Sequence, residues 1–238
     1  MKAIIIGATS GIGRELAKQM SAEGYTIGVS GRRTHMLQSL RKELSGKCFL
    51  STMDLSDVSE SVSRFKALLL EMDGVDIVVI NSGTGDTDPD FPLAGELETL
   101  SVNVVGFTAM ANVAYHHFTE KGRGHIVGTS SIMALRGGPY PSYNASKSYI
   151  SSYLEGLSCK SMINGYNIAV TDIRPGFVQT AMAKGDGLFW VSSVEKAAAQ
   201  IFDAIKAKKR VVYITKRWRF IAFLISILPF RLYLRLTN

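Results

Sequence analysis

Three polar residues in the middle of the chain have the types and spacing that carbonyl chemistry needs. Tyr143 and Lys147 stand four positions apart, which places them on one face of a helix, and Ser131 lies shortly before them. Reduction of a carbonyl needs a proton donor at the oxygen while hydride reaches the carbon, and oxidation needs the same group as a base. The pattern predicts a hydride-transfer site, although an isolated Tyr-x-x-x-Lys pair is also typical of an exposed helix face.

The lysine has the charge that a catalytic tyrosine requires. A free tyrosine titrates near 10, so acting as a base near neutral pH requires its pKa to fall by about three, roughly 4 kcal/mol. An ammonium group about 4 Å away, at an effective dielectric near 20, supplies an interaction of about that size. We therefore expect Lys147 to lower the pKa of Tyr143, with Ser131 hydrogen-bonded to the substrate oxygen.

A glycine-rich loop follows the first apolar run of the chain. It reads Gly7-Ala8-Thr9-Ser10-Gly11-Ile12-Gly13 and opens a helical pattern. Glycines permit a tight turn and let the backbone approach a pyrophosphate, which then lies at the helix N-terminus. A lone glycine loop is also compatible with a structural turn, but its position between first strand and first helix favours a dinucleotide site.

Two arginines follow the second apolar run. Arg32 and Arg33 stand where an NAD site usually has an aspartate or glutamate for the ribose 2′-hydroxyl, and no acid is present there. An arginine at this point favours a 2′-phosphate, so we expect NADP(H) rather than NAD(H), with Arg32 as the phosphate contact. The alternative is that both arginines are the solvated start of a helix.

Polar residues also follow the third and fourth apolar runs. Asp54 precedes Leu55, and its carboxylate is expected to accept a hydrogen bond from the adenine amino group or, alternatively, to cap a helix. Asn81-Ser82-Gly83 is a turn of small residues that would let the backbone pass close to the adenosine ribose.

The elements that must position these residues alternate along the chain. Buried-strand patterns at 3–6, 26–30, 49–53, 75–80, 125–129, 167–173 and 210–214 are separated by helical patterns at 12–23, 35–44, 58–72, 97–119, 143–163 and 194–207. This order predicts an α/β fold, a doubly wound parallel sheet of Rossmann type with helices on both faces. Ligands of such sheets bind at the carboxyl ends of the strands, which is where the polar residues lie.

Taken together, these motifs resemble the short-chain dehydrogenase/reductase family over about residues 3 to 215. The matching residues occur in the family's order and approximate spacing: the glycine loop, Asp54-Leu55, Asn81-Ser82-Gly83, Asn103, Ser131, Tyr143, Lys147 and Pro175-Gly176-Phe177-Val178-Gln179-Thr180. The resemblance implies that Tyr143 is the general acid and base, and that Lys147 lowers its pKa and holds the nicotinamide ribose. It also implies that Asn103 supports a proton-relaying water, and that Pro175, Gly176, Val178 and Thr180 flank the nicotinamide end.

The chain departs from the family pattern at three places. Ile6 stands where many members have threonine, and Ser82 where many have alanine. The interval from Ser131 to Tyr143 is one residue shorter than usual, and Ser130 fits the usual interval. The local sequence favours Ser131 with a deletion in the loop at 137–141, and Ser130 is the reserve candidate.

Composition favours one enzyme domain of a reducing compartment. The 238 residues are 46% hydrophobic without an obvious linker or repeat, and Cys48 and Cys159 have neither disulfide nor metal spacing. No secretory segment precedes the first strand, so we expect a cytoplasmic protein. His116 and His117 lack partners at ligand spacing, so we expect no metal site.

The positive charge is concentrated at the C-terminal end. Of the 27 lysines and arginines nine lie from Lys206 onward, with no acid among them, and the body carries 18 bases against 20 acids. This distribution argues against a nucleic-acid face. Residues 216–238 therefore form a basic and apolar helical tail beyond a catalytic NADP-binding domain at 1–215. The run Phe220–Leu228 is too short to span a bilayer, and we expect peripheral membrane contact, with Trp218 at the headgroups, or else burial against another subunit.

These observations favour an NADP(H)-dependent oxidoreductase that interconverts an alcohol and a ketone or aldehyde. Met182, Leu188, Phe189 and Trp190 stand where the family has its substrate lid. They either line a pocket for a small, apolar substrate or are ordinary packing of the lid, and we expect a homodimer or homotetramer. One alternative is a catalytically idle NADP-binding regulator, which would not need the intact catalytic set. Another is a sugar-nucleotide epimerase or dehydratase, which would need an added substrate domain.

Overall fold

The computed structural model of the chain describes residues 1–85, 88, 90–181 and 189–237. Its centre is one parallel sheet in the strand order β3-β2-β1-β4-β5-β6-β7. The strands are β1 (Lys2–Ile6), β2 (Thr26–Gly31), β3 (Cys48–Thr52), β4 (Ile77–Ile80), β5 (Arg123–Thr129), β6 (Asn167–Pro175) and β7 (Val211–Ile214). These are the seven strands that the sequence predicts, with ends that differ by at most two residues.

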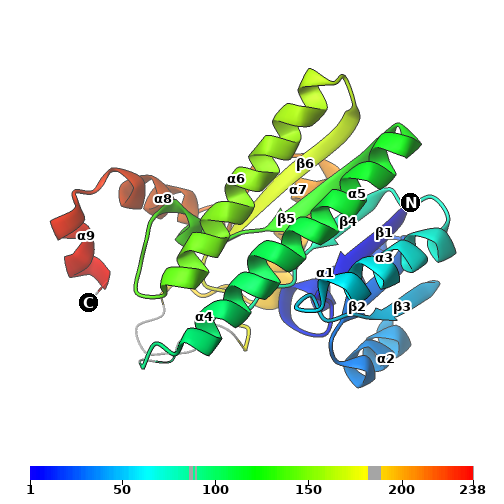
Figure 1. The fold of residues 1–238 in the computed structure, drawn as a ribbon, viewed down its shortest axis with the longest axis horizontal. Helices are drawn as coiled ribbons and strands as arrows, with labels where there is room; N and C mark the ends of the chain where they lie inside the picture. The colour runs from blue at the N-terminus through cyan, green and yellow to red at the C-terminus, as the bar shows by residue number, and fades with distance from the viewer. Residues whose placement is uncertain (86–87, 89, 182–188, 238) are drawn as a thin grey trace.

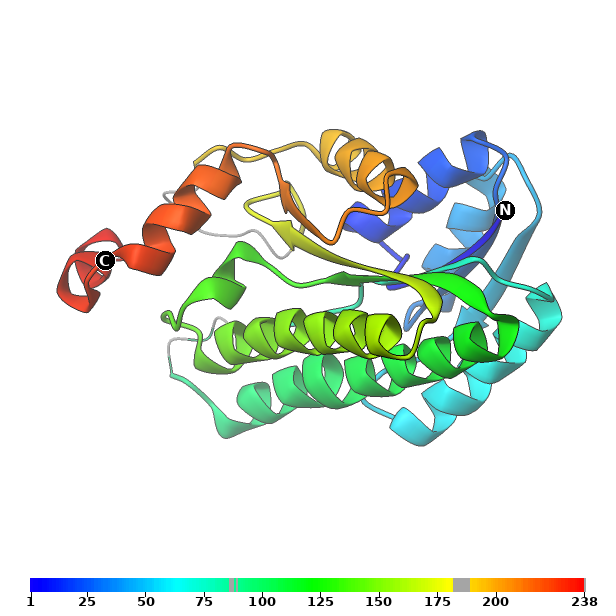
Figure 2. The ribbon, with the colours of Figure 1, turned by 90° about the horizontal axis from the view of Figure 1, so that it is seen from above.

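Helices cover both faces of the sheet (Figures 1 and 2). One face carries α1 (Gly11–Ala22), α2 (Thr34–Glu43) and α7 (Val194–Lys206), and the other carries α3 (Val58–Met72), α5 (Phe107–Lys121) and α6 (Pro141–Ile163). Each face has its own apolar core because side chains of a strand alternate: Ile5 lies in the first core, Ile4 and Ile6 in the second. The predicted doubly wound Rossmann-type fold is confirmed.

The sequence predicts one continuous helix over 97–119, and the structure differs. Here α4 (Leu93–Leu100) runs into a π-helical turn, η1 (Ser101–Gly106), before α5 begins. A π turn adds a residue to the helical repeat and rotates the following side chains. Asn103 lies inside this turn and is fully buried. The long helix predicted over 97–119 is therefore present, and the π turn that carries Asn103 is the feature that the sequence did not reveal.

The C-terminal residues form two helices, α8 (Trp218–Ile227) and α9 (Phe230–Thr237), which extend from one end of the sheet (Figure 2). Within the described part of the chain, no helix is long and apolar enough to cross a membrane. A short 3-10 helix, η2 (Ile132–Leu135), and the loop after it contact this pair: Arg136 donates to the carbonyl of Ile225, and the Tyr233 hydroxyl donates to the carbonyl of Gly137.

The prediction that Trp218 lies among lipid headgroups is wrong. Trp218 is 1% exposed and packs on the catalytic domain. Its indole ring lies where a side chain on Gly176 would be, since a Cβ there would come within 2.2 Å of the ring. Phe177 and Phe189 pack against the same indole, with ring centroids 5.4 and 5.1 Å away. Trp218 therefore belongs to the interior, although it lies beyond the boundary predicted at residue 215.

Candidate active site

Three of the predicted catalytic side chains meet where β5 ends and α6 begins. Tyr143 and Lys147 share one face of α6, and the Lys147 Nζ lies 5.6 Å from the centre of the Tyr143 ring. Ser131 follows β5, and its hydroxyl lies near enough to Tyr143 to lower the pKa of that side chain. Lys147 Nζ donates to the Thr129 carbonyl at 3.0 Å, which fixes its position against the strand. The structure thus brings these groups from strand and helix to one point at the carboxyl edge of the sheet.

The two neighbouring serines have different surroundings. Ser131 faces Tyr143 and accepts a hydrogen bond from the Met133 backbone N–H at 3.1 Å. The hydroxyl of Ser130 is turned away and donates to the carboxylate of Asp172. Successive residues of an extended chain point in opposite directions, which explains the separation. The geometry favours Ser131 over Ser130 as the serine that can reach a substrate oxygen.

The π turn directs Asn103 toward the same place. Its side-chain amide donates to the Thr84 carbonyl at 2.7 Å and to the Ser146 hydroxyl at 3.0 Å, and its carbonyl oxygen accepts from the Thr84 N–H at 2.9 Å. A Cβ on Gly83 would lie 3.0 Å from Lys147 Nζ and 3.4 Å from the Asn103 side-chain oxygen. Gly83 therefore leaves the space in which the lysine and the amide approach each other.

Burial dominates the electrostatics of this cluster. It raises the pKa of Tyr143, against a smaller lowering by the hydrogen bond from Ser131. It lowers the pKa of Lys147 to about 8, and the carboxylate of Asp172 opposes that fall. The lowering of the Tyr143 pKa by Lys147 stays a prediction, since burial is the main influence on this pKa in the structure and raises it.

The glycine loop leaves no room for side chains at its closest approaches. A Cβ on Gly13 would lie 2.2 Å from the Gly7 carbonyl oxygen, and one on Gly7 would lie 2.6 Å from the backbone nitrogen of Ser82. Gly7 also has a φ of +89°, in the left-handed region that glycine adopts readily. The loop packs tightly on the end of β4. The Ser10 side chain does not cap α1, so the first backbone N–H groups of that helix receive no hydrogen bond from it.

The two arginines after β2 differ in what they contact. The Arg33 guanidinium donates to the hydroxyls of Thr9 at 2.8 Å and Ser10 at 3.0 Å, so it braces the glycine loop. Arg32 is exposed and pairs with the exposed Glu98 at 3.6 Å. An ion pair between exposed groups at this distance is weak, so the Arg32 side chain is free to reorient toward a ligand.

The remaining predicted cofactor contacts are of two kinds: some lie at the carboxyl edge of the sheet, which we call edge groups, and others lie in the interior, which we call core groups. Asn81 donates to the Gly7 carbonyl at 3.3 Å, and the Thr180 methyl would lie 3.2 Å from a Cβ on Gly11, so both border the loop. Asp54 accepts from the N–H and hydroxyl of Ser56 and is not a helix cap, because Asp57 caps α3.

The core groups are packed in the interior of the protein. Leu55 and Val178 are 5% and 4% exposed and lie in the two apolar cores, so only their backbones could contact a cofactor. Gly176 faces Trp218, and Pro175 ends β6. Ile12 lies in the first turn of α1.

The lid prediction is only partly covered by the structure. Met182 and Leu188 lie outside the described residues. Phe189 and Trp190 are 48% and 41% exposed, and both pack on Trp218. Among the residues that the structure describes, no cluster of three or more His, Cys, Asp or Glu side chains could hold a metal ion.

Asp172, which no sequence motif singles out, is buried opposite Gly128 of β5, close to the catalytic groups. This carboxylate is 3% exposed and accepts hydrogen bonds from Ser151 at 2.7 Å and from the Arg174 guanidinium at 2.7 Å, as well as from Ser130. A signal was present, because an acid within an apolar strand must find partners when it is buried.

Comparison with known proteins agrees with the fold and shows the family. The family profile described as short chain dehydrogenase matches residues 1–188. An uncharacterized oxidoreductase of Myxococcus xanthus is 33% identical over 186 residues, 76% of this chain and 73% of that protein. Dehydrogenase/reductase SDR family member 7B of Mus musculus is 29% identical over 235 residues, 89% of this chain and 72% of that protein.

Solved structures show the same fold. A short chain dehydrogenase/reductase family protein superposes with a TM-score of 0.78 at 26% identity, covering 90% of this chain and 94% of the other. A 3-ketoacyl-ACP reductase of Sinorhizobium meliloti 1021 gives 0.79 at 24% identity, covering 90% and 96%.

The chain therefore belongs to the short-chain dehydrogenase/reductase family. It is an NAD(P)-dependent oxidoreductase of the kind that acts on CH–OH groups of small molecules.

Proposed function

We propose that this protein is an NADP(H)-dependent enzyme that interconverts an alcohol and a ketone or aldehyde, with Tyr143 as general acid and base. The observation that carries the proposal is the cluster of Ser131, Tyr143 and Lys147 at the carboxyl edge of the sheet. The edge also holds the tight glycine loop, so one surface offers both a dinucleotide cradle and a proton donor.

The residues present fit a dinucleotide. The open N-terminus of α1 and the close approach of Gly13 to Gly7 form a cradle that any side chain would fill. Asn81, Gly83 and Thr180 border it toward the catalytic end, and Asp54 lies beyond β3 for the adenine side. The nicotinamide, when bound, supplies or accepts the hydride.

The chain's own residues handle the proton. In reduction, Ser131 hydrogen-bonds the substrate oxygen and Tyr143 donates its phenolic proton to that oxygen. Lys147 supplies the positive charge that stabilises the resulting tyrosinate, and its position on the Thr129 carbonyl holds it beside the ring. Asn103 fixes the Thr84 backbone and Ser146 next to the lysine, and would hold the water that returns a proton. In oxidation the proton moves in reverse.

The preference for NADP(H) over NAD(H) rests on Arg32. Among the described residues its guanidinium has one weak ion pair, with Glu98, and it follows the end of β2, where an arginine suits a 2′-phosphate. Gly31 leaves no space for an acidic side chain, because a Cβ there would lie 2.7 Å from the Thr9 methyl. Arg33 contributes indirectly through Thr9 and Ser10.

The substrate that we propose is apolar, because Phe189 and Trp190 line the described part of the lid. We also propose peripheral membrane contact through residues 216–238. On α8 the side chains of Phe220, Phe223 and Ile227 are each at least 60% exposed on one face of the helix. Exposed apolar clusters of this kind mark interaction surfaces, and the basic tail complements anionic lipid. A homodimer or homotetramer is the proposed assembly.

A catalytically idle NADP-binding regulator is the alternative, and the site argues against it. Such a protein would need the glycine cradle but not a buried lysine held beside a tyrosine. The sugar-nucleotide epimerase or dehydratase alternative would also need a substrate domain, for which the sheet and its two helical layers provide no insertion among the described residues.

Steady-state NADPH oxidation tests the proposal. Purified protein is mixed with ketones, acyl-thioester analogues and sterols in turn, with NADPH or NADH, while the loss of reduced cofactor and the alcohol product are measured. We expect turnover with at least one apolar carbonyl compound and a preference for NADPH. Tight NADPH binding without turnover on any member of the panel would favour the idle regulator.

A further inference from the structure

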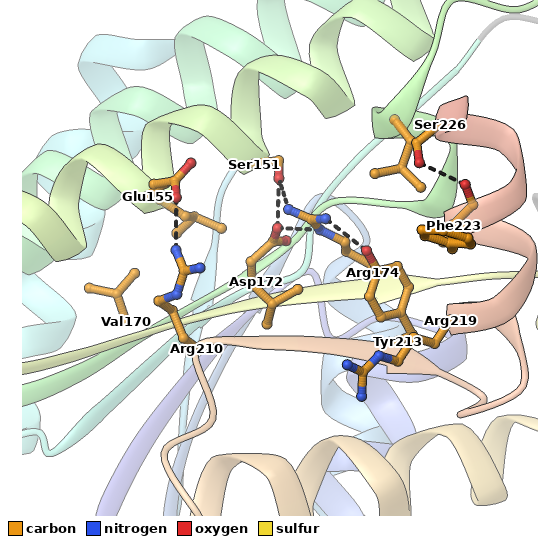
Figure 3. A pocket seen from close by; sticks show the side chains of 14 residues that line it. Ser151, Glu155, Val170, Asp172, Arg174, Arg210, Tyr213, Arg219, Phe223 and Ser226 are labelled. Atoms are coloured by element: carbon orange, nitrogen blue, oxygen red, sulfur yellow. Dashed lines mark hydrogen bonds and ion pairs between the residues drawn. The ribbon is translucent and has the colours of Figure 1, made fainter. Parts of the chain in front are cut away.

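The buried carboxylate of Asp172 forms the centre of a network beneath the catalytic residues. It lies on β6 and pairs in register with Gly128 of β5, beside the strand end that carries Thr129 and Ser131. Figure 3 shows Asp172 between the Ser151 hydroxyl and the Arg174 guanidinium. The third donor is Ser130, whose hydroxyl bonds the other carboxylate oxygen. Ser151 and Ser130 reach this carboxylate from α6 and from the residue after β5, and Arg174 reaches it from two positions further along β6 itself.

The network reaches the catalytic lysine through helix α6. Lys147 and Ser151 are four residues apart and lie on the same face of that helix, one turn from each other. Ser151 contacts Asp172 directly, and Lys147 contacts the Thr129 carbonyl on the strand next to β6. The carboxylate is thus placed under the same stripe of α6 as the ammonium group.

We propose that Asp172 is a positioning residue of this active site, which fixes the strand end that carries Ser131 and places a negative charge under the stripe of α6 that carries Lys147. The inference rests on the proposed function of the Tyr143 site. Ser130 links Asp172 to the strand end that carries Ser131. Its hydroxyl donates to Asp172, and its backbone N–H donates to the Ile173 carbonyl at 2.8 Å. With both bonds in place, the next residue points at Tyr143.

The electrostatic part follows from the charges around Lys147. The described groups that face it are the Tyr143 ring on its own helix, the Thr129 carbonyl of β5, Gly83 after β4, Asn103 of η1 and the carboxylate of β6. Asp172 is the one acid in this set, and Arg174 lies behind it. Burial lowers the pKa of Lys147 to about 8 and Asp172 opposes that effect. Its removal must therefore lower this pKa further.

Arg174 has the opposite influence. Its guanidinium donates to Asp172, to Ser151 at 2.6 Å and to the Tyr213 hydroxyl at 3.0 Å, and so partly neutralises the carboxylate. These residues line a cavity of about 410 Å³ between α6, the β6–β7 edge and α8 (Figure 3). Replacing Arg174 by a neutral residue leaves Asp172 with two hydroxyl donors and more of its charge uncompensated.

The pH dependence of kcat/KM for NADPH-dependent reduction tests the proposal. Lys147 must keep its proton, so kcat/KM falls as the pH rises through the pKa of Lys147. This fall is the alkaline limb of the pH profile. Asp172→Asn should move this limb toward lower pH by about one pH unit, and Arg174→Gln should move it toward higher pH. The control is Glu155→Gln, which removes a carboxylate from the same cavity where it is exposed and paired with Arg210 at 2.8 Å. Its limb should coincide with wild type.

A merely structural role of Asp172 would reduce activity at every pH and leave the limb in place, which would overturn the proposal. If Asp172→Asn does not fold, Arg174→Gln decides alone, because a general loss of stability cannot produce an alkaline shift. A limb unchanged or shifted to lower pH in Arg174→Gln would overturn it. Tyr143→Phe is measured in parallel: an active Tyr143→Phe enzyme would refute the proposed function itself, whereas an inactive one beside unshifted limbs would refute only the role of Asp172.

Discussion

The side chains around Tyr143 determine which protons the site can move and when. Tyr143 is partly buried, with Ser131 near it and the buried ammonium group of Lys147 beside its ring. Burial favours the neutral tyrosine, which is the form that donates a proton during reduction.

Substitution of the two arginines separates cofactor preference from loop structure. Arg32→Ala should weaken NADPH binding by about 1.5–3 kcal/mol, the size of a charged hydrogen bond, and leave NADH binding nearly unchanged. Arg33→Ala should weaken both cofactors, because Arg33 braces Thr9 and Ser10 in the loop that both cofactors use. Isothermal titration with each cofactor measures the four affinities. Equal losses for NADPH and NADH in Arg32→Ala would contradict the assignment.

Residue types and spacing predict most of the residues of the candidate site, but not the directions in which their side chains point. Motif order was enough to predict Ser131, Tyr143, Lys147 and the glycine loop as one site, and the structure brings them to one edge. Sequence alone left Ser130 and Ser131 as alternatives, because choosing between them requires knowing which way each strand-end side chain points. Asp172 went unnoticed because its partners are distant in the sequence.

At the scale of elements, the strands and most helices were predictable because buried parallel strands are short apolar runs between helical patterns. Helix α3 has the bounds that the sequence predicts. The π turn at η1 was not predictable, since apolar periodicity over a long helix does not reveal a single added residue. The burial of Trp218 was not predictable either, because its basic neighbours in the sequence suggested a position at the surface.

The burial of Trp218 predicts that helix α8 contributes to the stability of the catalytic domain. Trp218→Ala should lower the free energy of unfolding by about 3–5 kcal/mol, because it empties the space against Gly176 and Phe177. Trp218→Phe should cost less, since the indole N–H has no acceptor among the described residues. Chemical denaturation measures both. Phe220→Ala, on the exposed face of the same helix, should stay within about 0.5 kcal/mol of wild type. Similar losses at Trp218 and Phe220 would contradict this packing.

At the scale of the whole molecule, lid and tail form one region at the end of the sheet. Phe189 and Trp190 pack on Trp218, and the Arg217 guanidinium lies 5.0 Å from the centre of the Trp190 ring. The tail thus reaches the described edge of the lid on one side and the loop after η2 on the other. A surface that binds α8 would contact the protein close to the entrance proposed for the substrate.

Membrane contact predicts a selective effect of the exposed face of α8. The full chain should sediment with anionic vesicles, more weakly at high salt, because each basic residue near anionic lipid contributes about 1 kcal/mol. Phe220→Ser combined with Phe223→Ser should abolish this binding. Met162→Ser with Ile163→Ser removes two apolar side chains that are 78% and 84% exposed at the end of α6, and should leave it intact. If no variant binds vesicles but the α8 variant changes the assembly size, the surface is a subunit contact.

The central claim, that Tyr143 moves the proton, is tested most directly by Tyr143→Phe with a carbonyl substrate that the wild type reduces. Phenylalanine keeps the ring that packs beside Lys147 and Gly85 and removes only the hydroxyl. We expect kcat to fall by at least about a hundredfold, while NADPH affinity measured by titration stays within a few-fold of wild type. Substantial turnover by Tyr143→Phe at saturating substrate would contradict the assignment of Tyr143 as general acid and base.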